Sequence, residues 1–281
     1  FQDLNGNLWL ALYYGIGFVE INSRLFHYTR DNGIAGPVQS ACYFNNRLYI
    51  ATDKGVQYYD SLLDKFQFLE TLDKQAWYLL PLNNRLLIGT AKGLLEYSKR
   101  GINLLNESNT FCLYQSQDSK RTLYAGTDYG VEIYKPGPEG FQNSQTLELG
   151  SGVKTIAEDQ EGNVFFSTED RGIFYLNSRT PDRIDSIQEK EGPSPDWKQQ
   201  WNLENSVFSY KGLVYVGSEL GIFLLSKDSK NRFRCSINTK LWLKTKGGQV
   251  FRAAQAGNDL VYSYKEFLSK KNKNREKIIL L

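Results

Sequence analysis

Two pairs of adjacent carboxylates, Glu158–Asp159 and Glu169–Asp170, are the residues whose type best suits catalysis. Glycosidases use two carboxyl groups that lie roughly 5 to 9 Å apart, one as a general acid and the other as a base or nucleophile. Here the two members of each pair are sequence neighbours beside a turn, and neighbouring residues of a strand point to opposite faces of a sheet. We therefore expect neither pair to form a glycosidase site, and we predict no catalytic residue.

Metal ligands are scarce in this sequence. His27 is the single histidine, and the three cysteines Cys42, Cys112 and Cys235 are far apart and form no CxxC pair. This content argues against histidine-rich sites and four-cysteine zinc sites, and it predicts three free thiols rather than a disulfide scaffold. The segment 159–163 faintly resembles a calcium loop but lacks the spaced ligands and final glutamate of an EF-hand. No P-loop, GxGxxG after a strand, GxSxG or HExxH motif is present, so we predict no metal and no cofactor.

Polar and aromatic residues in regularly spaced tight turns are the candidates for ligand binding. Tyrosine rings stack on sugar faces and charged side chains bind hydroxyl groups, so these residues suit an oligosaccharide or another small polar ligand. The predicted ligand-binding residues, one from each clear copy of a repeat, are Tyr14, Lys54, Lys92, Tyr129, Arg171 and Glu219. The alternative interpretation is that each is a hairpin-turn residue that faces solvent.

The turns belong to a repeat in which two alternating runs flank a tight turn. Each copy has four alternating residues that end in a small one, then Thr or Ser, two or three turn residues, and Gly, as in Arg47–Tyr59. The turn glycines stand about 40 residues apart, at Gly15 (or Gly17), Gly55, Gly93, Gly130, Gly172 and Gly221. We expect the hydroxyl residue to hydrogen-bond its own turn, the glycine to adopt positive φ, and the small residue to mark close packing near a central channel.

Apolar runs on either side of the copies supply two further strands for each unit. Those before a copy are Val38–Phe44, Ala76–Leu82, Thr110–Gln115, Val153–Ala157 and Val207–Tyr210, and those after a copy include Leu25–Thr29 and Phe66–Leu72. Four short strands in a period near 40, without helical periodicity, are typical of a β-propeller blade. We predict an all-β fold: a single β-propeller over 1–281 with seven four-stranded blades, the chain ends sharing or truncating one. The repeats are clear over about 1–225, and 226–281 is expected to form a degenerate blade.

Composition narrows the classes of partner. With 41% hydrophobic and 23% charged residues, the chain has enough apolar material for a large core. A net charge of +3 predicts no strong polyanion partner, and the basic run Lys270–Lys277 lacks the interleaved aromatic residues of a nucleic-acid site. The longest apolar run, Leu8–Val19, is too short to span a membrane. The absence of methionine and the start at Phe1 suggest a piece of a longer protein.

One insertion breaks the period. Residues 179–205 are polar and carry Trp197 and Trp201 near their end. We interpret this segment as an excursion at a blade edge, and a lid or partner-contact loop is the alternative, because long loops in compact domains are often functional.

Two motifs resemble those of a known family. Tyr28–Ser40 resembles a linker with the pattern NGL-P-x-x-V, and both Gln2–Ala11 and Glu158–Thr168 resemble a hairpin with the pattern ED-x-x-GN-L-W-x-G-T. Together these segments resemble the two-component regulator propeller repeat, over roughly residues 1 to 225. The resemblance is specific for this class of repeat and less specific for the kind of protein that carries the repeat.

The resemblance implies a non-enzymatic sensor propeller of a bacterial hybrid histidine kinase or a related one-component regulator. Such propellers are typically extracytoplasmic, so a periplasmic location is expected, with a cytoplasmic one as the alternative. The implied partners are the other domains of the same regulator, a second copy in a homodimer, and a glycan-derived ligand. His27 has no phosphoacceptor context and is expected to be a strand residue.

Two other functions compete with sensing. A purely structural propeller would space or dimerise its neighbours without binding a ligand. A streptogramin-lyase-like enzyme would share the GNLW hairpins and the blade length, but such enzymes need a catalytic histidine and a metal-binding constellation, which one histidine makes hard to build.

Overall fold

The computed structural model describes residues 8–12, 15–19, 28–69, 72, 74–117, 120–137, 140–187, 205–218, 221–237, 249–256, 259–266 and 275–280. These residues form β-strands and one short 3₁₀ turn, Arg30–Asn32, and no α-helix occurs among them. The predicted all-β fold is confirmed.

Five sheets have four antiparallel strands each, and the order of strands within a sheet follows their order in the sequence. Their strands are β3 (Val38–Phe44), β4 (Arg47–Thr52), β5 (Gly55–Asp60) and β6 (Lys65–Phe68); β7 (Ala76–Leu82), β8 (Arg85–Thr90), β9 (Gly93–Ser98) and β10 (Gly101–Asn106); β11 (Thr110–Gln115), β12 (Leu123–Thr127), β13 (Gly130–Gly137) and β14 (Gly140–Glu148); β15 (Val153–Glu158), β16 (Val164–Thr168), β17 (Ile173–Asn177) and β18 (Thr180–Ser186); and β19 (Ser206–Tyr210), β20 (Leu213–Ser218), β21 (Gly221–Lys227) and β22 (Phe233–Ile237).

Two smaller sheets complete the described strands. A three-stranded sheet holds β23 (Gln249–Ala256), β24 (Asp259–Glu266) and β25 (Arg275–Leu280), and a hairpin holds β1 (Leu8–Leu12) and β2 (Gly15–Val19). The basic run at 270–277 therefore enters a strand at Arg275.

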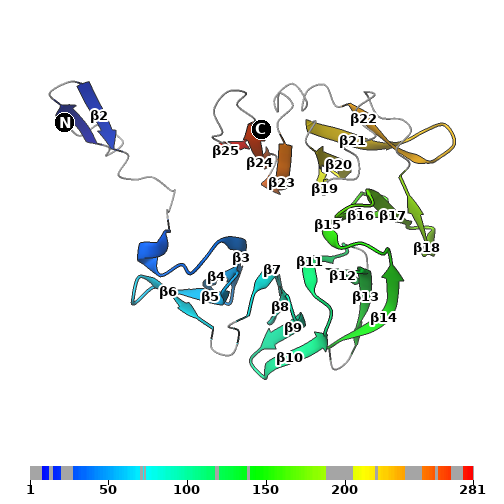
Figure 1. Ribbon diagram of the computed structural model, residues 1–281, viewed down its shortest axis with the longest axis horizontal. Helices are drawn as coiled ribbons and strands as arrows, with labels where there is room; N and C mark the ends of the chain where they lie inside the picture. Colours follow the sequence, from blue (N-terminus) through cyan, green and yellow to red (C-terminus); the bar gives the residue numbers. More distant parts are fainter. Residues whose placement is uncertain are drawn as a thin grey trace.

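The sheets follow one another around a common centre, with β3, β7, β11, β15, β19 and β23 as the neighbouring innermost strands (Figure 1). The blue hairpin of β1 and β2 lies apart from this ring in the same view. This is the arrangement of a β-propeller. The number of seven blades, the closure of the ring and the extent of a single domain over 1–281 stay predictions.

The innermost strands agree closely with the apolar runs in the sequence. β3, β7 and β11 have the predicted bounds, and β15 and β19 are each one residue longer. Two runs were predicted too long. β6 ends at Phe68, and Tyr28 and Thr29 lie in no strand, because the Thr29 side chain accepts a hydrogen bond from the Asp31 N–H and caps the 3₁₀ turn. His27 lies outside the described residues.

The predicted turn chemistry is confirmed. In five turns between the second and third strands the hydroxyl donates a hydrogen bond of 2.8 to 3.4 Å to the carbonyl of the turn glycine, in the pairs Thr52–Gly55, Thr90–Gly93, Thr127–Gly130, Thr168–Gly172 and Ser218–Gly221. All five glycines have positive φ. The buried hydroxyls thereby fix the direction in which each turn leaves its blade.

The recurring small residue has a steric cause, as predicted. A Cβ atom at Gly89 would lie 2.6 Å from the Thr110 carbonyl oxygen, and one at Gly126 would lie 2.8 Å from that of Val153. Thr110 and Val153 begin the innermost strand of the next blade. The residue in the second strand of one blade must therefore have a small side chain, or none, where the innermost strand of the next blade approaches it.

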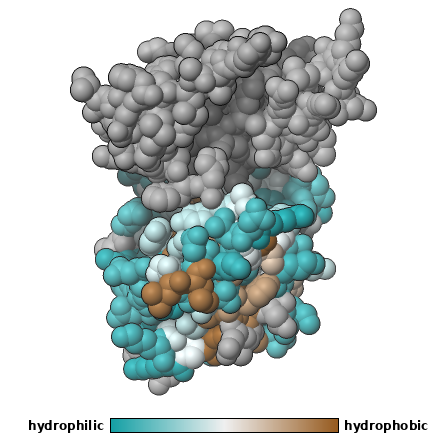
Figure 2. All heavy atoms as spheres, turned by 90° about the vertical axis from the view of Figure 1, so that its left-hand side faces the viewer, coloured by the Kyte–Doolittle hydropathy of each residue, from teal (hydrophilic) through white to brown (hydrophobic). Residues whose placement is uncertain are grey.

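The hydrophobic core lies between the faces of successive sheets. Val56 of one blade packs in a single buried cluster with Leu86 and Ile88 of the next, and all three side chains are fully buried. Complete burial of such a side chain stabilises the fold by about 1.5–3 kcal/mol. Some hydrophobic residues remain outside, and Figure 2 shows them among hydrophilic neighbours on the side that carries β3–β6, where Leu62 and Leu63 are exposed.

Buried polar contacts also join blades. Glu158 of β15 is buried, and its carboxylate accepts hydrogen bonds from the Ser116 hydroxyl at 2.7 Å and from the Tyr114 hydroxyl at 3.0 Å, both in the preceding blade. The Gln117 backbone N–H donates a third bond, at 3.0 Å. The contact between these blades is thus specified by hydrogen bonds as well as by apolar packing.

The cysteines lie in three different sheets and carry free thiols. Cys42 and Cys112 lie in the innermost strands β3 and β11, as predicted, and Cys235 lies in β22. Burial raises the pKa of the Cys112 thiol from 9.0 to about 12. The thiol is therefore held in its neutral form at physiological pH.

Candidate functional site

A β-bulge stands near the start of the innermost strand in four consecutive blades. The residue skipped by the pairing register is the second of its strand, and these residues are Gln39, Trp77, Phe111 and Lys154. A bulge leaves one residue unpaired and turns the strand locally, and bulges are common at the rims of barrels and beside active sites. In these four blades the fold thus presents one non-pairing side chain each at the inner rim.

These bulges lie at the same end of the blades as the turns that carry the predicted ligand-binding residues. The first residue of the innermost strand pairs with the hydroxyl residue that opens the turn, as in Thr110 with Thr127. Backbone bonds tie the two parts together, since the Asp128 N–H donates to the Asn109 carbonyl at 3.1 Å and the Glu169 N–H donates to the Gly152 carbonyl at 2.8 Å.

Four side chains from three consecutive blades meet at this end, and we call Trp77, Phe111, Lys154 and Glu169 the rim cluster. The Trp77 and Phe111 rings pack edge to face with centroids 5.7 Å apart. The Lys154 ammonium lies over the Phe111 ring, 3.3 Å from its centre, and 3.1 Å from a Glu169 carboxylate oxygen. The cluster therefore joins two aromatic surfaces to an ammonium and a carboxylate.

A hydrogen bond orients one ring of the rim cluster, and the charged side chains of the cluster are accessible to solvent. The Trp77 indole N–H donates to the Asn109 side-chain oxygen at 2.9 Å, which sets the orientation of the ring. The side chains of Lys154 and Glu169 are 36% and 57% exposed. Partly buried rings can stack on a polar ring of a ligand, and the neighbouring ammonium and carboxylate can exchange hydrogen bonds with its hydroxyl groups.

Two predicted residues, Tyr129 and Arg171, come together beside this cluster. The Gly150 N–H donates to the Tyr129 carbonyl at 3.1 Å, and a Cβ atom at Gly150 would lie 3.1 Å from the Arg171 guanidinium carbon. Two residues further along, a Cβ atom at Gly152 would lie 3.1 Å from the Phe111 ring. The connector at 149–152 thus brings the turns of two blades next to the rim cluster.

The other described candidates lie elsewhere on the same end. Lys92 lines a separate hollow of about 960 Å³ together with Ile102 and Leu104, between β3–β6 and β7–β10. Lys54 lies 3.9 Å from its own neighbour Asp53. Tyr14 and Glu219 lie outside the described residues. That these six residues bind a ligand stays a prediction.

The adjacent carboxylates have separate partners. Glu158 binds side chains of the preceding blade, whereas Asp159 accepts bonds from the Glu161 and Asn163 backbone N–H groups, both at 2.9 Å. The segment that faintly resembles a calcium loop is therefore a hairpin turn closed by its own aspartate. In the second pair, Glu169 faces Lys154 and Asp170 binds the hydroxyl of Ser151.

No group of three or more metal-ligating side chains occurs within the described part of the chain. None of the helical structure described there is long and apolar enough to cross a membrane. The insertion contributes β18, but Trp197 and Trp201 fall outside the described ranges.

Sequence reasoning missed Trp77, Phe111 and Lys154. A signal did exist, because each is the second residue of a predicted innermost strand. Their residue types differ, however, and a bulge is a property of the pairing between two strands. Only the register shows that these positions are equivalent.

The fold is similar to that of several solved structures. The extracellular domain of BT3049, named as a hybrid two-component system, from B. thetaiotaomicron matches with a TM-score of 0.65 and 20% identity, covering 94% of this chain and 37% of that chain. The extracellular domain of BT4673, named as a one-component system, from the same organism matches with a TM-score of 0.59 and 16% identity, covering 93% and 36%. The chain spans just over a third of the length of these two domains.

A virginiamycin B lyase from Staphylococcus aureus also matches, with a TM-score of 0.55 and 13% identity, covering 85% of this chain and 83% of that chain. At these identities the likeness shows the fold, and it supports the predicted propeller. The neighbours include the class of regulator that the repeat motifs resemble. No protein-family model and no curated protein matches the chain.

Proposed function

We propose that this chain is a non-enzymatic, ligand-binding propeller module of a bacterial signal-transduction regulator. The observation that carries the proposal is the rim cluster, in which partly buried aromatic rings, an ammonium and a carboxylate from three blades converge at the end that gathers the predicted turns. The two-component and one-component systems among the structural neighbours support a signalling role.

The chemistry of the cluster favours an uncharged, hydroxyl-rich ligand. Lys154 and Glu169 largely cancel each other's charge, so neither a strong anion nor a strong cation is preferred. Aromatic rings beside hydrogen-bonding groups suit a glycan-derived oligosaccharide. Tyr129 and Arg171, which flank the cluster, would add a further ring and further donors.

The signalling step follows from where the ligand would sit. A ligand that contacts several blades would bind with different affinity to two different arrangements of those blades. It can shift the equilibrium between these two conformational states only by that difference in affinity. The partners would be other domains of the same regulator and a second copy in a homodimer. Because the neighbouring regulator domains are extracellular, we place this module outside the cytoplasm, in the periplasm.

Binding of a panel of oligosaccharides, followed by calorimetry on each hit, tests the proposal. Phe111→Leu should weaken binding at least tenfold, because it removes the ring between Trp77 and Lys154 but keeps an apolar side chain. Tyr43→Ala is the matched control, since Tyr43 is 72% exposed and lies near the other end of its innermost strand. A panel without any hit, or a hit that Phe111→Leu leaves unchanged, would favour a purely structural propeller.

Lyase activity is the alternative that the comparisons raise. A histidine-to-alanine variant of the neighbouring lyase, solved with quinupristin, is described as catalytically inactive, so a histidine matters in that enzyme. This chain has one histidine, His27. We expect quinupristin incubated with this protein to elute unchanged in liquid chromatography, and a new product peak would establish the enzyme instead.

A further inference from the structure

A second cavity opens at the end of the propeller opposite the rim cluster. It has a volume of about 470 Å³ and lies between β7–β10 and β11–β14. Its walls are the turn after β7, the end of β11, and the turn between β13 and β14, all of which lie far from the turns between second and third strands. Small-ligand sites commonly have volumes of about 300–1,000 Å³.

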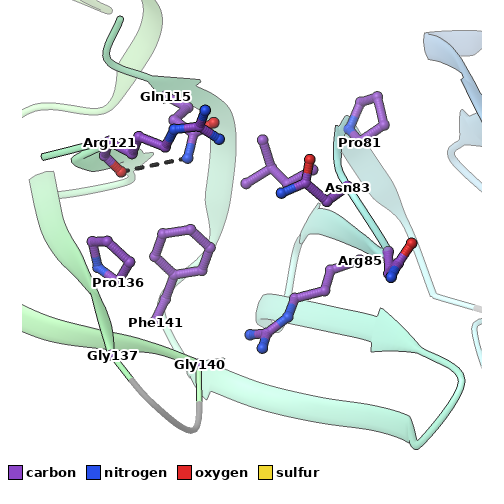
Figure 3. Close-up of a pocket in the computed structure, with 11 residues that line it drawn as sticks. Pro81, Asn83, Arg85, Gln115, Arg121, Pro136, Gly137, Gly140 and Phe141 are labelled. Atoms are coloured by element: carbon purple, nitrogen blue, oxygen red, sulfur yellow. Dashed lines mark hydrogen bonds between the residues drawn. The ribbon is translucent and has the colours of Figure 1, made fainter. Parts of the chain in front are cut away.

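Two arginines from different blades face this cavity (Figure 3). Arg85 donates from Nη1 to a Glu96 carboxylate oxygen at 3.0 Å, and its side chain is 36% exposed. A guanidinium has five N–H donors in a planar fork. The ion pair therefore holds Arg85 in place and leaves further donors for a ligand.

Arg121 stands on the opposite wall in a strained backbone conformation. Its φ is +49°, a left-handed region that residues with a side chain seldom adopt. The Gln115 side-chain amide donates to the Arg121 carbonyl at 3.4 Å, and the Ser116 N–H donates to the next carbonyl, that of Thr122, at 2.8 Å. Among the described residues the Arg121 guanidinium has no ion-pair partner. Strain of this kind gathers at functional sites.

The remaining walls supply an apolar surface and amide groups. Phe141 and Pro136 stand below Arg121 on the same wall (Figure 3). Asn83 and Gln115 add amide groups to the rim of the cavity. A Cβ atom at Gly140 would lie 3.1 Å from Arg85 Nη1, so the glycine leaves room for the guanidinium.

We propose that this cavity binds a small carboxylate carried on a ring, with the carboxylate on the Arg121 guanidinium group and the ring against Phe141. Arginine forks match carboxylate oxygens in geometry, and an aromatic side chain packs well on a ring. The site is separate from the proposed ligand site at the rim cluster, so either can fail without the other.

Calorimetry with benzoate as the probe tests this site on the intact protein. Binding should be detectable at millimolar benzoate and should weaken as salt is added. Benzyl alcohol has the ring without the charge and acetate has the charge without the ring, so both should bind at least tenfold more weakly. Equal binding of benzyl alcohol would overturn the role of Arg121, and equal binding of acetate would overturn the role of the ring. D-Glucuronate in place of benzoate distinguishes a sugar acid from an aromatic acid as the source of the carboxylate.

Arg121→Gly separates binding from folding. Glycine accepts a φ of +49° without strain, so the melting temperature should stay equal or rise while benzoate binding falls at least tenfold. Arg100→Gln is the matched control, because Arg100 lies in a turn of the adjacent blade, between β9 and β10, and does not line the cavity. Failure of the wild-type protein to bind benzoate, or unchanged binding by Arg121→Gly, refutes the proposal.

Discussion

The ammonium of Lys154 in β15 lies 3.3 Å from the centre of the Phe111 ring in β11, so a cation from one blade covers an aromatic ring from the preceding blade. Both residues are the skipped positions of β-bulges. An irregularity that repeats in successive blades therefore creates a contact that regular strands would not make.

Removing this cation should cost little stability. Lys154→Met keeps the aliphatic stem but loses the ammonium, and cation–π contacts at accessible sites contribute about 0.5–1 kcal/mol. We expect a loss of this size in urea denaturation. Lys230→Met, in an exposed turn between β21 and β22, should change the free energy of unfolding by less than about 0.5 kcal/mol. A loss of several kcal/mol at Lys154 would mark it as a core residue.

The turn residues next to the cluster should matter for signalling and little for folding. In the double variant Tyr129→Ala/Arg171→Ala, each change should alter the free energy of unfolding by no more than about 0.5 kcal/mol, because both side chains are exposed. Ligand-dependent output of the full-length regulator should fall. Normal output from a stably folded double variant would exclude this rim as the sensing site.

The buried carboxylate between blades should be important for stability. Glu158→Ala leaves three donors, from Tyr114, Ser116 and Gln117, without their acceptor, and we expect a loss of about 3 kcal/mol. Glu158→Gln keeps one acceptor oxygen and should lose less. Glu161→Ala provides the surface comparison, because Glu161 is 56% exposed in its ion pair with Lys227, and its cost should be much smaller. Chemical denaturation measures all three, and equal losses at 158 and 161 would contradict the inter-blade role.

Two turn glycines differ in what surrounds them. A Cβ atom at Gly93, where φ is +132°, would lie 2.1 Å from the Asn106 carbonyl oxygen, whereas nothing lies within 4 Å of one at Gly101, where φ is +114°. Gly101→Ala should cost only the backbone strain, about 1–2 kcal/mol, and Gly93→Ala should cost clearly more. Thermal unfolding of both variants measures the difference, and an equal effect would show that the turn relaxes freely.

Alkaline pH should destabilise the fold through Cys112. Because burial raises the pKa of its thiol from 9.0 to about 12, the folded state keeps a proton that the unfolded state loses first. The stabilisation is therefore complete below pH 9 and declines between pH 9 and about 12, by up to about 1.4 kcal/mol for each pH unit.

Cys112→Ala should flatten this dependence when the free energy of unfolding is measured against pH. The variant also loses packing, so the slope with pH rather than the absolute stability is the quantity to compare. An unchanged slope would mean that other groups, such as the half-buried Tyr114 and the buried Tyr134, whose pKa values burial raises, dominate alkaline unfolding.

The sequence alone determined the strands and turns of the blades. Alternation of apolar residues marks a strand, and a hydroxyl residue followed by a turn and a glycine marks a tight reversal, so β3, β7 and β11 could be predicted to the residue. These signals are local: each depends on residues within a few positions of one another. The same locality explains why the turn candidates Lys54, Lys92, Tyr129 and Arg171 could be named, but not which of them meet.

Only the tertiary structure determined which side chains come together at the candidate site. Trp77, Phe111 and Lys154 become neighbours only because successive innermost strands lie side by side and each skips one residue in its pairing. Likewise, Arg85 and Arg121 face one cavity although they belong to different blades. Contacts between blades depend on register and on the angle between sheets, which are set by packing over the whole ring. No pattern within one repeat encodes these contacts, and so the turn residues could be predicted from the sequence whereas the contacts between blades could not.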